Sequence, residues 1–242
     1  MALNTILSHP EQNSYVTVAE ASDYLLTKQG YDAWAALSTA KKEAFLKQAA
    51  LQMNEIRYKA YEVYDRDKDY RREQKLAFPR VYYNTLHYGN ATSATATTVS
   101  VLQLGGQQYL ADDVLNGGTV VIREGTGRGQ TLAITDWVSA TGTATVSGWT
   151  VQPDTTSGIV FIKPVDEKVQ YAQIEQAYFL SQYKDEDILN IISGVESYRI
   201  GDLSETYGGA NVRFALVGGR PFSPLAQSLL NGLIDTTGYI TY

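Results

Sequence analysis

Apolar positions recur at helical spacing near both ends of the chain and alternate with polar positions between them. In residues 14–83, Thr17 and Glu20 have the spacing of a capping box, which predicts that a short helix begins there. Ser38 is placed to cap a second, longer helix of roughly 20 residues, whose apolar side chains recur at intervals of three and four. The apolar positions of this longer helix are Phe45, Leu46, Ala49, Ala50, Met53 and Ile56.

The middle of the chain alternates apolar and polar residues with a period of two, and Gly, Asn or Asp separates the alternating segments. This pattern predicts a small β-domain of roughly five to seven short strands. The stretch NATSATATT (90–98) is typical of a flexible linker that leads into it. The clearest strand segments are TVSVLQL (98–104), TVVIREG (119–125), TLAITDW (131–137) and TATVSGW (143–149).

A helical pattern returns at Pro164, a residue type favoured in the first turn of a helix. Asp166 and Glu167 lie where the helix dipole favours acidic side chains, and Tyr171 begins an apolar stripe. Ser223 and Pro224 then open a last, leucine-rich helix. We therefore predict an α+β protein: a helical, bundle-like domain of residues 1–83 and 164–242, interrupted by an antiparallel β-domain, a barrel or sandwich, of residues 84–163.

Composition narrows the classes of function. The formal net charge is −6 and the pI is about 5.0, so free DNA or RNA is a disfavoured partner. There are no cysteines, which excludes disulfides, thiolate metal sites and a cysteine nucleophile. No apolar run approaches the ~20 residues of a membrane span, so no membrane partner is expected.

The stretch EGTGRGQTLAIT (124–135) resembles a phosphate-binding loop, because Gly125, Gly127 and Gly129 alternate with other residues. It lacks the Lys-Ser or Lys-Thr of a Walker loop, and a strand pattern follows it where a helix would be required. The glycines are better explained as positive-φ positions of a hairpin turn, so no cofactor is expected.

A charged stretch, DRDKDYRREQK (65–75), spaces three aspartates as a calcium loop does. Tyr70 and Leu76 stand where such a loop needs Gly and Glu, so no metal site is expected. Acidic residues offset the basic ones, so the stretch is a poor nucleic-acid patch, and a solvated segment or a protein contact is favoured. For the protein contact we assign Arg66, Arg71 and Arg72 as candidate interface residues.

Residues for catalysis are scarce. His9 lies in an N-terminal arm and His87 beside the predicted linker, so we expect no rigid scaffold around either. The acidic run at 185–187 is interpreted as a solvated turn, and no hydrolase or metalloprotease motif is present. The chain is predicted not to be an enzyme.

The uncharged C-terminus, TTGYITY (236–242), could add a strand to a neighbouring molecule, or it could be a frayed end. For the first alternative, the candidate interface residues are Tyr239, Ile240 and Tyr242.

Several motifs together resemble a family of tailed-phage head–tail adaptors, or connectors, whose members are often labelled DnaT-like single-stranded-DNA-binding proteins. The resemblance rests on SYVTVAEASDYL (14–25), QKLAFPR (74–80), QYAQIEQAYFL (170–180), YRIGDLSETY (198–207) and PFSPLAQSLL (221–230). The middle of the chain is similar to a β-module of phage structural proteins, through GTGRGQTLAITDW (125–137) and ATVSGWTVQPDTTSGIVFI (144–162).

The resemblance implies a virion structural protein at the neck of the particle, made in the host cytoplasm. It would form a dodecameric ring with copies of itself below the portal protein, pass double-stranded DNA through its channel, and dock a tail or stopper protein. The alternative is a single-stranded-DNA-binding protein of phage replication, which requires aromatic residues interleaved with basic charge. The acidic net charge favours the adaptor.

Overall fold

The structure is a computed structural model, and it divides into two compact units. The helical unit comprises Met1–Leu3, Val16–Lys59 and Glu167–Tyr242, and the β-unit comprises Asn4–Tyr15 and Ala60–Asp166. The predicted domain boundaries near residues 84 and 163 stay a prediction. The described residues are 2–7, 9, 11–28, 31–59, 61–62, 75–81, 86–101, 110–182, 197–200, 203–206, 215–217 and 220–235.

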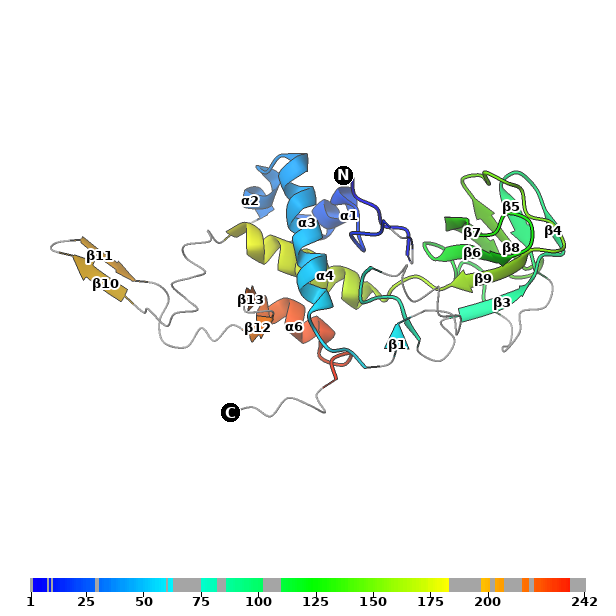
Figure 1. The fold of residues 1–242 in the computed structure, drawn as a ribbon. Helices are drawn as coiled ribbons and strands as arrows, with labels where there is room; N and C mark the ends of the chain where they lie inside the picture. Colours follow the sequence, from blue (N-terminus) through cyan, green and yellow to red (C-terminus); the bar gives the residue numbers. More distant parts are fainter. Residues whose placement is uncertain are drawn as a thin grey trace. The chain divides into compact units, whose positions relative to one another are not determined.

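The helical unit forms around three packed helices (Figure 1): α4 contacts both α3, which crosses it, and α6. Its apolar cluster is lined by buried side chains such as Leu25, Trp34, Leu46 and Ile174. The helices are α1 (Val18–Leu26), α2 (Tyr31–Ala35), α3 (Thr39–Asn54), α4 (Glu167–Gln182) and α6 (Pro224–Leu230). Two hairpins pair β10 (Ser197–Ile200) with β11 (Leu203–Thr206), and β12 (Ala215–Val217) with β13 (Arg220–Phe222).

The predicted helix starts at Thr17, Ser38 and Ser223 are confirmed. The Thr17 hydroxyl accepts the Glu20 backbone N–H at 3.2 Å, and the Glu20 carboxylate accepts the Thr17 N–H at 2.6 Å. Ser38 caps α3, and Ser223 caps α6 with Pro224 in its first turn. Each signal is local, so each acts wherever the helix packs.

The predicted start at Pro164 is wrong. α4 begins at Glu167, while β9 ends at Ile162 and the buried Val165 still belongs to the β-unit. The chain has to leave the sheet before it can turn into a helix. Proline therefore lies in the connection and not in the first turn.

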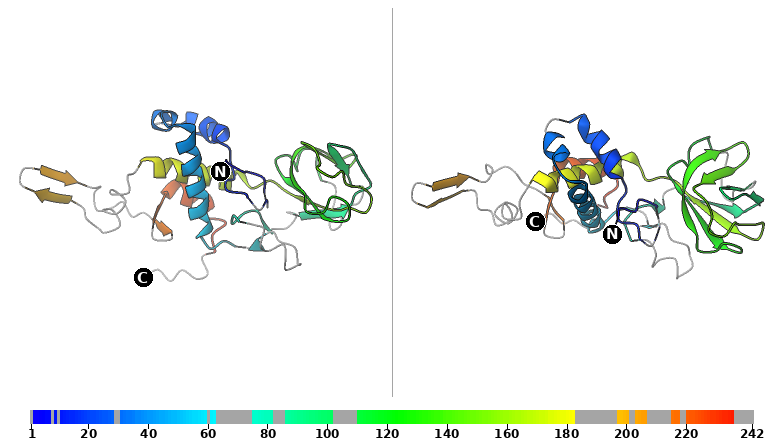
Figure 2. Two further views of the ribbon diagram at one scale, coloured as in Figure 1. Left: turned by 45° about the horizontal axis from the view of Figure 1, so that its top comes forward. Right: turned by 90° about the horizontal axis from the view of Figure 1, so that it is seen from above.

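The β-unit holds an antiparallel sheet in the order β3-β9-β6-β7-β8-β5-β4, and the sheet curls into a half-barrel (Figure 2). Helices and antiparallel strands are both present, so the α+β class is confirmed. Its strands are β3 (Leu86–Asn90), β4 (Ser93–Ala94), β5 (Thr98–Ser100), β6 (Thr119–Glu124), β7 (Thr131–Val138), β8 (Thr143–Val146) and β9 (Gly158–Ile162). A separate pair joins β1 (Tyr61–Glu62) to β2 (Arg80–Val81).

The sheet is brought round by one bent segment, residues 86–94. Its first half, β3, pairs with β9, and its second half, β4, pairs with β5. At the bend the Ala91 N–H donates to Ser157 O at 3.0 Å, and the Thr92 N–H donates to Ser100 O at 2.8 Å. The two ends of the strand order are therefore neighbours in the chain.

The prediction of a flexible linker at 90–98 is wrong. Ala91 is buried, and the Thr95 hydroxyl receives the Thr97 and Thr98 backbone N–H groups. The two threonine hydroxyls, of Thr95 and Thr98, also bond at 2.7 Å. Small, polar composition alone suggested disorder, but the side chains complete a tight turn between two strands.

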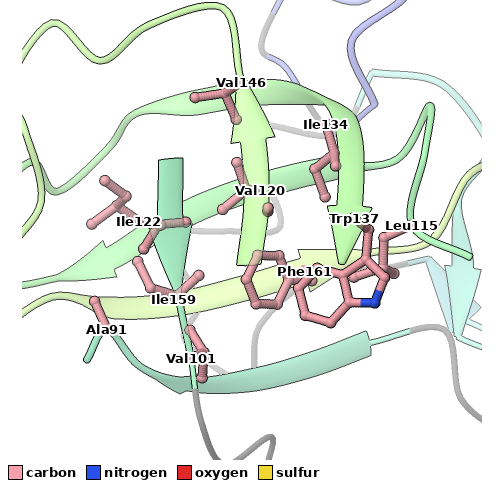
Figure 3. Packing of buried hydrophobic residues seen from close by; sticks show 12 residues of the cluster. Ala91, Val101, Leu115, Val120, Ile122, Ile134, Trp137, Val146, Ile159 and Phe161 are labelled. Carbon is pink, nitrogen blue, oxygen red and sulfur yellow. The ribbon is translucent and has the colours of Figure 1, made fainter. Parts of the chain in front are cut away.

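The core of the β-unit lies inside the curled sheet (Figure 3). The Trp137 and Phe161 rings pack edge to face, with 5.2 Å between their centroids. The core residues are Ala91, Val99, Val101, Leu115, Val120, Ile122, Ile134, Trp137, Ala144, Val146, Ile159 and Phe161. None of these side chains is charged, so the interior is held by apolar packing.

Candidate functional site

The glycine-rich stretch is a hairpin turn, as predicted. Gly125, Gly127 and Gly129 have φ values of +71°, +82° and +90°, and they connect the antiparallel strands β6 and β7. A Cβ at Gly125 would overlap the carbonyl oxygen of Thr156, so space as well as φ requires glycine there.

Side chains lock this turn to the loop before β9. Gln130 accepts the Thr150 N–H at 2.7 Å and donates to Val151 O at 2.7 Å. The Thr126 hydroxyl donates to the Asp154 carboxylate at 2.7 Å. The polar side chains of the turn are therefore hydrogen-bonded within the protein, and their role is to hold the turn in place.

The two histidines have different surroundings. His87 lies in β3 opposite Phe161 and is 1% exposed, so the prediction that no rigid scaffold holds it is wrong. The strand alternation at 86–90 was overlooked because the segment next to it was interpreted as a linker. His9 lies in the N-terminal segment, where its Nδ1 accepts the Glu11 N–H at 3.0 Å.

The residues assigned to interfaces lie outside the described residues, and so does the acidic run at 185–187. The interface residues are Arg66, Arg71, Arg72, Tyr239, Ile240 and Tyr242. Asp65, Asp67 and Asp69 of the considered calcium loop also lie there.

Aromatic rings and a cation meet where α1 contacts α4. The Tyr24 and Tyr171 rings stack with their centroids 4.5 Å apart and an interplanar angle of 18°. Lys28 Nζ lies 4.9 Å from the centroid of the Tyr24 ring and pairs with Glu175. We call Tyr24, Lys28, Tyr171 and Glu175 the tyrosine–lysine cluster.

Local geometry places these side chains. Tyr171 and Glu175 are four residues apart on α4 and share one face, whereas Tyr24 lies in the last turn of α1 and Lys28 just past its C-cap, where the Lys28 N–H donates to Leu25 O. Glu175 is 3% exposed, whereas Tyr24 and Tyr171 are half-buried. The cluster therefore has a buried carboxylate, and its two aromatic rings are partly exposed.

Hydrogen bonds fix the charge state of the cluster. The Tyr24 hydroxyl donates to Glu175 Oε1 at 2.7 Å, and Lys28 Nζ donates to the same oxygen. Burial and the bond to Glu175 raise the pKa of Tyr24, so its hydroxyl stays protonated. Burial alone would lower the pKa of Lys28, but its bonds to Glu175 and Tyr24 outweigh burial and raise this pKa, so the ammonium stays charged.

The sequence pattern does not reveal this cluster. Tyr171 belongs to the predicted apolar stripe of its helix, and neither Lys28 nor Glu175 belongs to a recognisable motif. A glutamate at position 175, within that stripe, was the available signal. Its partner Lys28 is 147 residues away, so the pattern within either helix could not identify it.

A second feature is the sequence of residues 57–88, which interleaves charge and tyrosine. It holds eight Arg or Lys residues against five Asp or Glu, a net +3 in a chain of net −6. The basic residues are Arg57, Lys59, Arg66, Lys68, Arg71, Arg72, Lys75 and Arg80, and the tyrosines are Tyr58, Tyr61, Tyr64, Tyr70, Tyr82, Tyr83 and Tyr88. The positive charge that the whole-chain average hides is concentrated here.

The start of this segment is fixed to the helical unit. Tyr58 forms an antiparallel bridge with Ile234, and the Lys59 N–H donates to Leu233 O at 2.8 Å. The Arg57 side chain, 71% exposed, pairs with Asp235 at 3.1 Å. The basic segment therefore begins, with the side chains of residues 57 and 59, at a defined place on the surface of the helical unit.

Within the described part of the chain, no group of three or more His, Asp or Glu side chains is arranged to hold a metal ion. No helix in those same ranges has the length and hydrophobicity that a bilayer crossing requires.

Comparison with known families identifies one match. Residues 1–124 match the sequence profile of a family described as "Putative DnaT-like ssDNA binding protein". None of the curated proteins and none of the solved structures matches the chain. The matched residues include α1, α2, α3 and the whole basic, tyrosine-rich segment.

The match corrects the functional prediction. The head–tail adaptor interpretation, with its virion, connector and portal-binding roles, is wrong, because the matching family is described as DnaT-like single-stranded-DNA binding and not as an adaptor. The portal, tail and ring partners were predictions that rested on that interpretation. The net charge of the whole chain was a poor guide to DNA binding, because it averages a basic segment with an acidic remainder. Since the match spans more than half of its residues, the chain belongs to this DnaT-like single-stranded-DNA-binding family.

Proposed function

We propose that this protein binds single-stranded DNA, and that its role is binding and not catalysis. The observation that carries the proposal is the family match over residues 1–124. Single-strand binding without sequence preference requires aromatic rings for stacking and cations along the backbone path. Tyr24, Lys28 and the basic segment lie within the matched region, and Tyr171, outside it, stacks on Tyr24.

The tyrosine–lysine cluster supplies the rings. Tyr24 and Tyr171 are half-buried, so each is held by the unit's core and keeps part of its surface accessible. Their stacking orients both rings before any ligand arrives, which reduces the entropy lost on binding. A base that extends this stack gains roughly 1–3 kcal/mol.

The segment 57–88 supplies the cations. Its net charge is +3, so the rest of the chain carries −9. Strand phosphates are attracted to this segment and repelled by the acidic remainder, which concentrates the phosphate contacts on this segment. Arg57, at the surface of the helical unit, marks where that region begins among the described residues.

Fluorescence anisotropy with a labelled oligothymidylate and with a duplex of equal length, at physiological salt, tests the proposal. The wild-type chain is expected to bind the single strand more tightly than the duplex, because a duplex hides the base faces. Tyr171→Leu is expected to lower single-strand affinity about 10-fold, the loss of one stacked base.

Tyr31→Leu is the matched control. Tyr31 is also a half-buried tyrosine packed on the core of the helical unit, but it belongs neither to the tyrosine–lysine cluster nor to the segment 57–88. Its replacement is expected to change affinity less than Tyr171→Leu does. Absence of single-strand binding by the wild-type chain, or equal affinity for the duplex, would refute the proposed function.

A further inference from the structure

We propose that Glu175 determines which part of the DNA the tyrosine–lysine cluster recognises: by neutralising Lys28, it makes the cluster a site for a base and not for a phosphate. The inference rests on the proposed single-strand binding and specifies the chemistry of one contact. It follows from the burial of Glu175 and from the two donors that share its oxygen.

Glu175 cannot easily leave this arrangement. It is 3% exposed, and it lies within a run of buried α4 residues, 172–177. A carboxylate at such a site keeps its partner, because an unpaired buried charge is strongly unfavourable. The ion pair with Lys28 therefore persists while a ligand binds at the rim.

Lys28 is committed to that pair. Its side chain is 31% exposed, but its ammonium bonds to Glu175 and lies against the Tyr24 ring. A phosphate that approaches Lys28 also meets the Glu175 charge at nearly the same distance. Attraction and repulsion then offset each other.

Stacking has no such conflict. The half-buried Tyr24 and Tyr171 side chains keep part of their surface accessible, and the stacking of a base on such a ring does not depend on net charge. The neutral cluster therefore favours the uncharged part of a nucleotide. It contributes affinity that depends little on salt, whereas the segment 57–88 contributes the salt-dependent part.

Glu175→Gln separates these contributions. The amide oxygen can still accept from Tyr24 and Lys28, but the cluster gains one net positive charge. The slope of log affinity against log salt for oligothymidylate is expected to steepen by about 0.7, the value for one added single-strand phosphate contact. Between 500 and 50 mM salt, the variant should then gain about 5-fold in affinity relative to wild type.

Two further variants make the result specific. Glu43→Gln changes the net charge equally and also breaks a Glu–Lys pair, with Lys47 at 3.4 Å, but on the half-exposed surface of α3. It is expected to leave the slope nearly unchanged. Lys28→Met combined with Glu175→Gln removes both charges of the cluster and is expected to return the slope to the wild-type value.

The outcomes distinguish the two proposals. No single-strand binding by wild type refutes the proposed function and this inference with it. Binding by wild type with an unchanged slope in a folded Glu175→Gln variant refutes this inference alone, as does an equal effect of Glu43→Gln. If Glu175→Gln does not fold, the double variant decides: a slope shallower than wild type by about 0.7 would show that Lys28 already contacts a phosphate.

Discussion

The helical unit and the β-unit use buried polar side chains differently. In the helical unit, buried polar side chains connect helices that are far apart in sequence: Gln173 Nε2 donates to Leu46 O at 2.8 Å, and Gln176 Nε2 donates to Gln52 Oε1 at 2.5 Å. In the β-unit, the cluster inside the curled sheet is apolar, buried polar residues such as His87 and Thr119 lie outside that cluster, and a polar network lies at the β6–β7 turn.

The difference follows from the residues that each unit has available. Helix α4 buries alanines and glutamines, so much of its interior surface is small or polar and must be satisfied by hydrogen bonds. The sheet buries large aliphatic and aromatic side chains, whose packing needs no such bonds. A functional cluster that contains a buried acid therefore fits the helical unit, where polar groups are already bonded across helices.

The largest loss of stability is expected when a large core side chain of the β-unit is removed, and this loss should be confined to that unit. Trp137→Ala is expected to destabilise this unit by about 3–5 kcal/mol, because it leaves a cavity beside Phe161. Urea unfolding monitored by near-UV circular dichroism measures the loss, and the signal at 222 nm reports the helices. Trp149→Ala, at a half-buried position, should cost less. Equal loss of helical signal would show that the units unfold as one.

In the helical unit, loss of a single hydrogen-bonding group should be costly. Gln176 also accepts the Ser223 N–H at 2.7 Å, so Gln176→Leu leaves partners unsatisfied in α3 and before α6. The expected destabilisation is about 3 kcal/mol, measured by urea unfolding at 222 nm. Gln182→Leu, at the exposed end of α4, is the control. A loss of stability no larger than in the control would contradict the claim that buried hydrogen bonds stabilise this unit.

At the β6–β7 turn, alanine substitutions at two glycines distinguish backbone strain from steric overlap. Gly125→Ala is expected to destabilise the β-unit by roughly 2–3 kcal/mol, because both a positive φ and the Thr156 carbonyl oppose a Cβ. Gly129→Ala has the same kind of φ and open space, so about 1 kcal/mol is expected. Thermal unfolding of the β-unit measures both, and equal losses would rule out the steric contribution.

The smallest effect should be a pH dependence of the β-unit. Hydrogen bonds from the Thr156 and Thr126 hydroxyls, and from the Thr156 N–H, hold the pKa of Asp154 below its usual value. A lowered pKa in the folded state means stability that is present above the ordinary aspartate pKa and lost as pH falls through the lowered one. The midpoint of thermal unfolding between pH 7 and pH 3 should therefore fall less in Asp154→Asn than in wild type. Parallel curves would contradict this contribution.

Much of the local structure was predictable because its causes are local. The helix caps at Thr17, Ser38 and Ser223 depend on side chains within three residues of the backbone groups they bond. The strand pair around the glycine turn depends on a two-residue alternation and on positive φ at Gly125 and Gly129. These features need no knowledge of distant residues.

What the tertiary structure decided involves partners far apart in the chain. The start of α4 at Glu167 depends on where strand β9 ends. The ordered structure of residues 90–98 depends on pairing with strands β5 and β9. The tyrosine–lysine cluster joins α1 to α4, and no spacing within either helix encodes that Lys28 meets Glu175. Sequence periodicity determines which face of a helix is buried, because that face repeats every few residues. Which two faces meet is decided by packing, because it depends on the whole unit at once.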